Sequence, residues 1–270
     1  SECSTSAHIV SGSAGEGVVH EVDNDVRLGV EEDEALAHEA VLQAFRQGRQ
    51  RREHLRRHGR KRHFVGVAGV DAQRDRAGVV VENRRQQAYA IAAECVAEFV
   101  AERFGEYATD TKPKMVWIHA VSVGEARAAA PLVRALQELL PDHGLLLTCT
   151  TAAGRETVKQ VYGESVLAAY LPYDYPRAIQ GFLEHFRPRL GVLMETEVWP
   201  NLLAVCAQNG VPLLLANARM SARSARGYRR LRWLSEPAFR SLAAVCAQSA
   251  ADAERLAALG APRIEVTGNL

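Results

Sequence analysis

The sequence predicts an α/β fold built around a doubly wound parallel sheet, and three observations lead to it. From residue 115 onward, short apolar runs alternate with longer amphipathic ones, which is the strand and helix order of a repeated β–α unit. Most of the short runs are largely apolar, as expected for parallel strands that helices cover on both faces. Hydrophobic residues make up 47% of the 270-residue chain, which is enough for a sizeable core.

Each apolar run is expected to be a strand, and each amphipathic run after it a helix. The predicted strands are residues 115–121, 144–150, 166–171, 190–194, 211–216, 243–248 and 264–267. The predicted helices are residues 125–140, 152–162, 176–186, 201–208, 222–242 and 250–259. Pro131 is expected to open the main body of the first helix or to kink it. Ligands of such sheets bind at the carboxyl ends of the strands, so the polar residues that follow the strands are the site candidates.

Residues 1–100 differ from the rest and are expected to form a largely disordered segment rich in Arg and His. The α/β domain is assigned to residues 101–270. The run RQGRQRREHLRRHGRKR (residues 46–62) is strongly basic and is expected to form a solvated or poorly ordered segment, with a nucleic-acid or anionic-lipid contact as the alternative. The other elements expected here are a short helix at 31–45, a weak hairpin at 64–83 and an amphipathic helix at 88–100.

Composition excludes several classes of protein. The formal net charge of +1 argues against a dedicated nucleic-acid binder. Five scattered cysteines without a C-x-x-C pair indicate neither a disulfide framework nor a zinc site, and a reducing, cytoplasmic compartment fits them best. No stretch has the roughly 20 nearly uncharged apolar residues of a transmembrane helix, and no secretory signal is visible.

The first polar cluster follows the first predicted strand and contains Ser122, Gly124 and Glu125. Gly124 is expected to allow a sharp turn from strand to helix. Glu125 then lies at a helix N-terminus, which favours the ionised carboxylate and makes this residue a candidate general base. The alternative is an acid that only stabilises the start of the helix. The turn lacks G-x-G-x-x-G, which argues against a dinucleotide site.

Two further clusters follow the second and fourth predicted strands. Thr150 and Thr151 precede a helix start and are expected either to bind a phosphate or carboxylate or to cap that helix. Glu195 and Glu197 directly follow a buried strand. Two carboxylates are costly there unless they are paired or solvated, so a role in a cleft and a plain loop remain the two interpretations.

The fourth cluster follows the fifth predicted strand and contains Arg219, Ser221 and Arg223. The two arginines are four residues apart and share a face if the segment is helical. Arg226, Arg229 and Arg230 would extend this face into a basic surface suited to an anionic acceptor, a phosphate or a membrane surface. A solvated helix face is the alternative.

Five motifs occur in one order along the chain. They are WIHAVSVGE (117–125), LLLTCTTAAGRE (145–156), METEVWPN (194–201), NARMSARS (217–224) and VTGNL (266–270). Together they resemble the N-terminal lobe of the 3-deoxy-D-manno-octulosonic acid (Kdo) transferases, over residues 102–270.

The resemblance implies the N-terminal, Rossmann-like lobe of a two-lobed GT-B glycosyltransferase. Such an enzyme transfers Kdo from CMP-Kdo to a lipid A precursor, with inversion and with neither a catalytic metal nor a cofactor, at the cytoplasmic face of the bacterial inner membrane. By resemblance, Glu125 is the base that deprotonates the acceptor hydroxyl, Glu195 is functionally important, and Glu197 is its neighbour in the motif. The assignment of Arg219 and Arg223 to the acceptor's phosphates rests on charge alone.

The chain departs from the family in two places. An apolar membrane-anchoring helix precedes this lobe in the family, whereas a basic stretch stands here. The chain also stops where the second, donor-binding lobe is expected, so it should transfer little Kdo alone. The expected partners are a lipid A precursor, CMP-Kdo through the other lobe, and an anionic membrane surface in peripheral contact, with no specific nucleic acid. The alternatives are a lobe of another GT-B sugar-nucleotide enzyme and a non-enzymatic α/β binding module with a basic tail.

Overall fold

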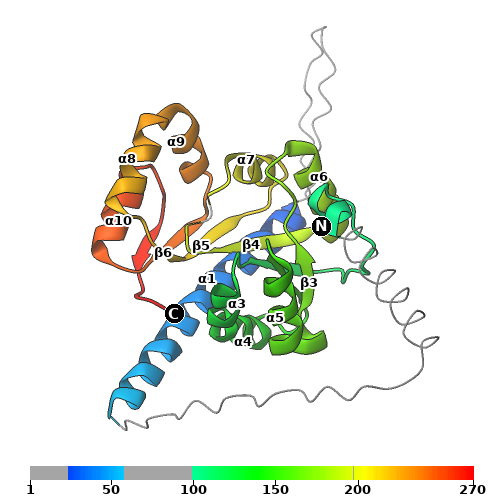
Figure 1. Ribbon diagram of the computed structural model, residues 1–270, viewed down its shortest axis with the longest axis horizontal. Helices are drawn as coiled ribbons and strands as arrows, with labels where there is room; N and C mark the ends of the chain where they lie inside the picture. The colour runs from blue at the N-terminus through cyan, green and yellow to red at the C-terminus, as the bar shows by residue number, and fades with distance from the viewer. Residues whose placement is uncertain (1–23, 58–98, 197) are drawn as a thin grey trace, which may run out of the picture.

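The computed structural model describes residues 24–57, 99–196 and 198–270. Within them the chain forms a seven-stranded sheet in the order β3-β2-β1-β4-β5-β6-β7, and every neighbouring pair of strands is parallel (Figure 1). The predicted doubly wound α/β fold is confirmed. The strands are β1 (Met115–His119), β2 (Gly144–Cys149), β3 (Leu167–Tyr170), β4 (Pro188–Met194), β5 (Leu213–Ala218), β6 (Ala244–Ala247) and β7 (Ile264–Val266).

Helices cover both faces of the sheet, and they lie above and below it in Figure 1. On one face lie α1 (Asn24–Arg57), α3 (Val123–Ala128), α4 (Ala130–Leu139) and α5 (Ala152–Tyr162). On the other lie α6 (Pro176–Phe186), α7 (Pro200–Gln208), α8 (Ala222–Arg230), α9 (Arg232–Arg240) and α10 (Ala250–Ala257). A short 3-10 helix, η1 (Gly163–Ser165), joins α5 to β3.

The core consists of two layers, one on each face of the sheet, and β1 contributes side chains to both. Val116 and Ile118 of β1 point into the first layer, and Trp117 points into the second, because alternate residues of a strand face opposite sides. All three side chains are fully buried. The Trp117 ring packs edge-on against Phe182 of α6, with ring centroids 5.0 Å apart. The uniform apolarity of the strand therefore reflects burial on both faces, as the sequence predicts.

Helix α1 is longer than the helix expected at residues 31–45, and it belongs to the core. Ala37, Ala40, Val41, Ala44 and Phe45 are all at most 2% exposed and pack into the first layer. Their spacing of three and four residues places them on one helix face. The start of the basic run, expected to be poorly ordered, continues this helix, because its arginines and glutamines are good helix formers. The core thus takes in residues that precede the expected boundary at 101.

Several other elements differ in detail from the predictions. The first helix is divided at Ala129, and Pro131 lies in the first turn of α4, so the proline opens the main body. The segment predicted as one helix at 222–242 forms α8 and α9, with a break at Leu231.

Two predicted elements cannot be compared with the structure. The hairpin expected at 64–83 and most of the helix expected at 88–100 lie outside the described residues. Among the described helices, none has the length and apolarity needed to cross a membrane.

Candidate functional site

The candidate site lies at the edge of the sheet where the parallel strands end. The strand order reverses between β1 and β4, because the chain builds outward from β1 to β3 on one side and from β4 to β7 on the other. A crevice at such a reversal is the usual ligand position in doubly wound sheets. Glu125 follows β1 and Glu195 follows β4, so the two predicted catalytic acids flank this point. The loops after β2 and β5 adjoin them on either side.

Both carboxylate oxygens of Glu125 are fixed by donors at the start of α3. Ser122 Oγ donates to Oε1 at 2.9 Å, and the backbone N–H of Val121 donates to Oε2 at 2.9 Å. The N–H of Glu125 donates in return to Ser122 Oγ at 3.2 Å, so Ser122 is the N-cap of the helix. The helix N-terminus and the two donors stabilise the ionised carboxylate. Glu125 is half-buried beside exposed Ser122 and Gly124, where a ligand hydroxyl can approach it.

Gly124 does not make the sharp turn that the sequence analysis assigned to it. Its φ lies outside the left-handed region that favours glycine, and it occupies an ordinary position in α3. A Cβ at this position would meet its nearest neighbour, Ser122 Oγ, at 3.7 Å, an ordinary contact distance. The turn therefore needs no glycine, and what Gly124 contributes is an open surface next to Glu125.

The two threonines after β2 have separate roles. Thr151 is the N-cap of α5 and accepts a hydrogen bond from the N–H of Gly154 at 3.1 Å, which confirms the capping interpretation. Thr150 Oγ1 instead donates to the carbonyl of Val121 at 3.1 Å. Because the N–H of Val121 holds Glu125, Thr150 ties the loop after β2 to the candidate base.

Two residues at the strand ends have left-handed backbone conformations although neither is glycine. Glu195 has φ +58° and Asn217 has φ +56°. Such conformations are uncommon outside glycine, and they cluster at functional sites where the surrounding structure enforces them. The N–H of Glu195 donates to the carbonyl of Ala216 at 2.8 Å, and Asn217 Oδ1 accepts from the N–H of Leu270 at 3.2 Å. Glu197 lies outside the described residues.

The fourth cluster lies next to the Glu195 loop. The hydroxyl of Thr196 donates to the carbonyl of Arg219, which joins the loops after β4 and β5. Ser221 is the N-cap of α8 and accepts from the N–H of Ser224 at 3.0 Å. Arg219 and Arg223 are exposed at this edge. The structure therefore brings the four predicted clusters into one row along the carboxyl ends of β2, β1, β4 and β5.

A buried arginine that the sequence analysis did not single out supports this row. Arg103 is 7% exposed, and it donates to the carbonyl of Leu171 at 2.6 Å and to the carbonyl of Thr150. Its guanidinium packs against the rings of Phe99 and Tyr173, at 5.1 and 5.3 Å from the ring centroids. Burial lowers the pKa of Arg103 from its usual value. Arg103 thus anchors the loop that carries Thr150.

A buried acid, Glu102, and a partly buried acid, Asp174, were also missed. Glu102 is 2% exposed; it accepts from the N–H of Tyr170 at 2.6 Å and pairs with Arg155 at 3.2 Å, so it satisfies the outer edge of β3. Asp174 accepts from the N–H of Leu202 at 2.8 Å and so caps α7, which follows the Glu195 loop. Neither role leaves a repeating pattern in the sequence. The only available signals are an acid close to an aromatic residue for Glu102 and an acid close to a helix start for Asp174.

His119 lies at the end of β1 beneath the site and is fully buried. Its Nδ1 lies 2.9 Å from Oγ1 and 3.1 Å from the carbonyl oxygen of Thr148, and within the described residues its Nε2 has no hydrogen-bond partner. The indole N–H of Trp117 donates to the same Thr148 Oγ1 at 2.7 Å. Burial lowers the pKa of His119 to about 4, so the ring is neutral at neutral pH.

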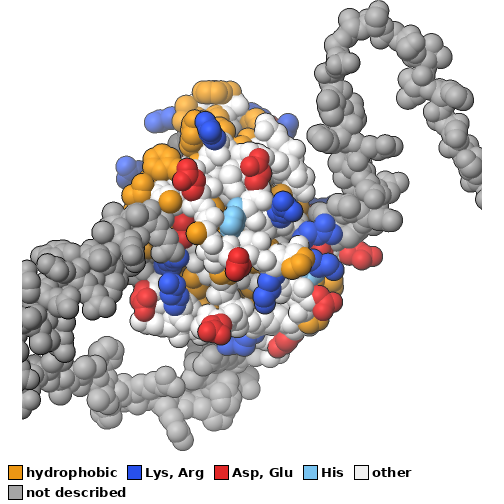
Figure 2. Space-filling model, turned by 90° about the vertical axis from the view of Figure 1, so that its right-hand side faces the viewer, with side chains coloured by type: hydrophobic (Ala, Val, Ile, Leu, Met, Phe, Trp, Pro, Cys, Tyr) orange, Lys and Arg blue, Asp and Glu red, His pale blue; other side chains and the backbone are white. Residues whose placement is uncertain are grey.

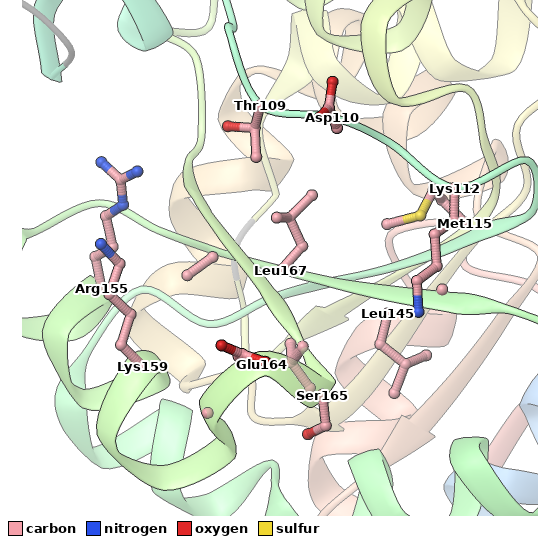
Figure 3. A pocket seen from close by; sticks show the side chains of 14 residues that line it. Thr109, Asp110, Lys112, Met115, Leu145, Arg155, Lys159, Glu164, Ser165 and Leu167 are labelled. Atoms are coloured by element: carbon pink, nitrogen blue, oxygen red, sulfur yellow. The ribbon is translucent and has the colours of Figure 1, made fainter.

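A cavity of the described structure lies away from this site. It has a volume of about 620 Å³ and is lined by the first residues of β1 to β3 together with α5. In Figure 3, Leu167 lies near its centre, with Arg155 and Lys159 on one side and Lys112 and Met115 on the other. It therefore opens toward the amino ends of the strands, away from Glu125. No group of three His, Cys, Asp or Glu side chains that could hold a metal occurs in the described part of the chain.

The chain is similar in sequence to known 3-deoxy-D-manno-octulosonic acid transferases. A 3-deoxy-D-manno-octulosonic acid transferase of Haemophilus influenzae is 40% identical over 175 residues, which are 63% of this chain and 41% of that protein. The transferase of Bordetella pertussis is 44% identical over 184 residues, which are 64% and 42% of the two chains. This chain therefore spans about two fifths of the length of these relatives.

The chain is also similar to a solved structure and matches a family model. The UDP-GlcNAc 2-epimerase of Neisseria meningitidis, solved with UDP-GlcNAc bound, superposes with a TM-score of 0.43 at 18% identity, over 58% of this chain and 46% of that one. The family model of 3-deoxy-D-manno-octulosonic-acid transferase (kdotransferase) matches residues 98–270, which include the whole row of strand-end clusters. The chain belongs to the Kdo transferase family.

Proposed function

We propose that the chain forms the acceptor-binding lobe of an inverting glycosyltransferase, which transfers Kdo from CMP-Kdo to a lipid A precursor in lipopolysaccharide synthesis. The observation that carries the proposal is the Glu125 carboxylate. It is held by two donors at the carboxyl edge of the sheet, in a chain that belongs to the Kdo transferase family. A hydroxyl nucleophile needs a positioned base, and a carboxylate with both oxygens oriented can supply one.

In the proposed reaction, Glu125 takes the proton from the acceptor hydroxyl. The hydroxyl oxygen attacks the anomeric carbon of Kdo, and the bond from that carbon to the CMP phosphate breaks. CMP leaves with the electron pair, and attack from the face opposite the leaving group inverts the configuration. The proposal includes neither a metal nor a cofactor, since the leaving phosphate needs little acid assistance.

The remaining clusters have supporting roles in the proposal. Arg219, Ser221 and Arg223 bind the phosphates of the acceptor, because arginine forms strong charge-assisted hydrogen bonds with phosphate oxygens. Thr150 positions the loop that holds Glu125, and Glu195 orients the acceptor from the neighbouring strand end. The lobe works in peripheral contact with an anionic membrane surface, at the cytoplasmic face of the bacterial inner membrane, and has no specific nucleic-acid partner.

The proposal can be tested by joining the chain at Leu270 to the C-terminal half of the Bordetella pertussis relative and measuring Kdo transfer from CMP-Kdo. Glu125→Gln should reduce kcat at least about a hundredfold, since general bases contribute roughly 10²–10⁴-fold. The matched control is Glu156→Gln, which neutralises an exposed acid near the start of α5 and should transfer at the parental rate. Equal activity of Glu125→Gln and the parent, with both folded, would refute the proposed role.

A further inference from the structure

The corner between α8 and α9 exposes large apolar side chains. Leu231 is 53% exposed, Trp233 is 77% exposed and Leu234 is 41% exposed. Phe239 of the same helix is fully buried and packs edge-on against Tyr228, so the corner is firmly attached to the second core layer. An indole exposed to this degree, with two exposed leucines beside it, forms an apolar tip that does not pack into the core.

The charged side chains around this tip are mostly positive. Between residues 219 and 240 the chain has seven arginines and one acid, Glu236. Glu236 is paired with Arg232 and with Arg240 of the same helix. The remaining arginines are Arg219, Arg223, Arg226, Arg229 and Arg230, all exposed and, among the described residues, in no ion pair with an acid.

Helix α8 arranges part of this charge in a line. Arg223, Arg226 and Arg230 are spaced by three and four residues and so share one face of the helix, opposite buried Ala225. The line begins at the carboxyl edge of the sheet, where Ser221 caps the helix, and ends at the apolar tip. Such segregation is not general on this molecule, because Figure 2 shows acidic and basic side chains interspersed on another face.

We propose that this arginine line and the Leu231–Leu234 tip form a docking surface for an anionic phospholipid bilayer. Tryptophan and leucine at the tip enter the interfacial region, where an indole is favoured. The arginines along α8 contact the lipid phosphates, as basic side chains next to an interfacial apolar group do. A lipid surface accommodates both parts of the pattern, because its phosphates pair with arginine and its interfacial region takes up the indole and the two leucines.

The docking surface deepens the proposed function and rests on it in one respect: a lipid-borne acceptor would reach Arg219 and Ser221 along the same helix that contacts the membrane. The physical argument for lipid binding needs only the side chains of α8 and α9. Vesicle binding without acceptor or donor therefore tests the surface independently of Kdo transfer. A chain that binds vesicles but gives an inactive joined enzyme would refute the proposed function alone.

The experiment is sedimentation of the 270-residue chain with phosphatidylcholine vesicles, with and without phosphatidylglycerol. We expect binding only when the anionic lipid is present. The pair Arg226→Ser with Arg230→Ser should lower the partition coefficient roughly 25-fold, since one basic residue near an anionic surface contributes roughly fivefold. Trp233→Ser should lower it roughly tenfold, since burial of a large apolar side chain contributes about that factor. All three positions are exposed, so the variants should fold.

Matched controls remove the same chemistry from other faces. Tyr175→Ser removes a 55% exposed aromatic ring, and the pair Arg134→Ser with Arg177→Ser removes two exposed arginines. Both controls should bind as the parent does. The proposal is overturned if the parent fails to bind anionic vesicles or if the tip variants bind as well as the controls. It is also overturned if deletion of residues 46–62 alone abolishes binding.

Discussion

Lowering the pH should destabilise this protein through one buried histidine. His119 is fully buried and its pKa is lowered from 6.5 to about 4, chiefly because burial disfavours the charged ring. In the unfolded chain the ring is solvated and its pKa is near 6.5. Protons therefore bind the unfolded chain first as the pH falls, and the folded state loses stability relative to it.

The size of the effect follows from the two pKa values. The contribution of neutral His119 is intact above pH 6.5 and is lost as the pH falls from 6.5 to about 4. Each pH unit in that window costs about 1.4 kcal/mol, so the loss is about 2 kcal/mol at pH 5 and about 3 kcal/mol at pH 4. Other groups titrate in the same window, so the His119 share must be obtained as a difference between variants.

The measurement is urea unfolding at pH 7 and at pH 5 for the parent, His119→Gln and His185→Gln. Gln at 119 cannot take up a proton, so this variant should lose about 2 kcal/mol less between the two pH values than the parent does. A constant cost of the substitution cancels in this comparison. His185 is only partly buried, and its replacement is the control for removing one histidine. If His119→Gln and the parent show the same pH dependence, the buried ring is not the cause and the reasoning is refuted.

Two further predictions concern packing and the buried guanidinium. Arg103→Met should lower the free energy of unfolding by about 3 kcal/mol, because it leaves the buried carbonyl of Leu171 and the part-buried carbonyl of Thr150 without their donor. Urea unfolding at neutral pH measures this, and a change below about 1 kcal/mol would contradict it. Gly191→Ala should lower the free energy of unfolding by about 2 kcal/mol, since its Cβ would lie 2.5 Å from a Leu213 methyl and 2.6 Å from the Trp117 ring. Gly227→Ala, in open space on α8, should raise it by about 1 kcal/mol. Thermal unfolding of the two variants measures both effects, and equal Tm shifts would contradict the prediction.

The sheet could be predicted because its signal is local and repeated. The central strands are largely apolar, as in Val116–Ile118, and each strand from β1 to β6 is followed by a helix with its own start and stop residues. Pro131 is an example, since a proline in the first helical turn is compatible with a new helix but not with the middle of one. The strand-end clusters could also be located, because in a parallel sheet every strand ends at the same edge.

The parts that could not be predicted depend on contacts between distant segments. Glu102 and Arg103 look like ordinary surface charges at the end of a helix, and only the packing of that helix on β3 buries them. The left-handed backbone of Glu195 likewise arises from the strand pairing that holds its N–H against Ala216. The prediction for Gly124 was wrong because Ser122 forms the turn by capping α3. The turn therefore requires no residue in a left-handed conformation.

The capping and catalytic interpretations of Glu125 are compatible. Ser122 and the N–H of Val121 hold the carboxylate as in a capping box, which accounts for the acid by helix stability alone. The same two hydrogen bonds fix the position of both oxygens, which is what a general base requires. Glutamine can keep the capping geometry, with its Oε1 accepting from the N–H of Val121 and its amide donating to Ser122 Oγ, but it cannot accept the proton. Alanine removes both functions at a cost of about 1 kcal/mol. A chain in which Glu125 only capped α3 would therefore tolerate glutamine in full, and a chain in which it is also the base would stay folded and lose transfer.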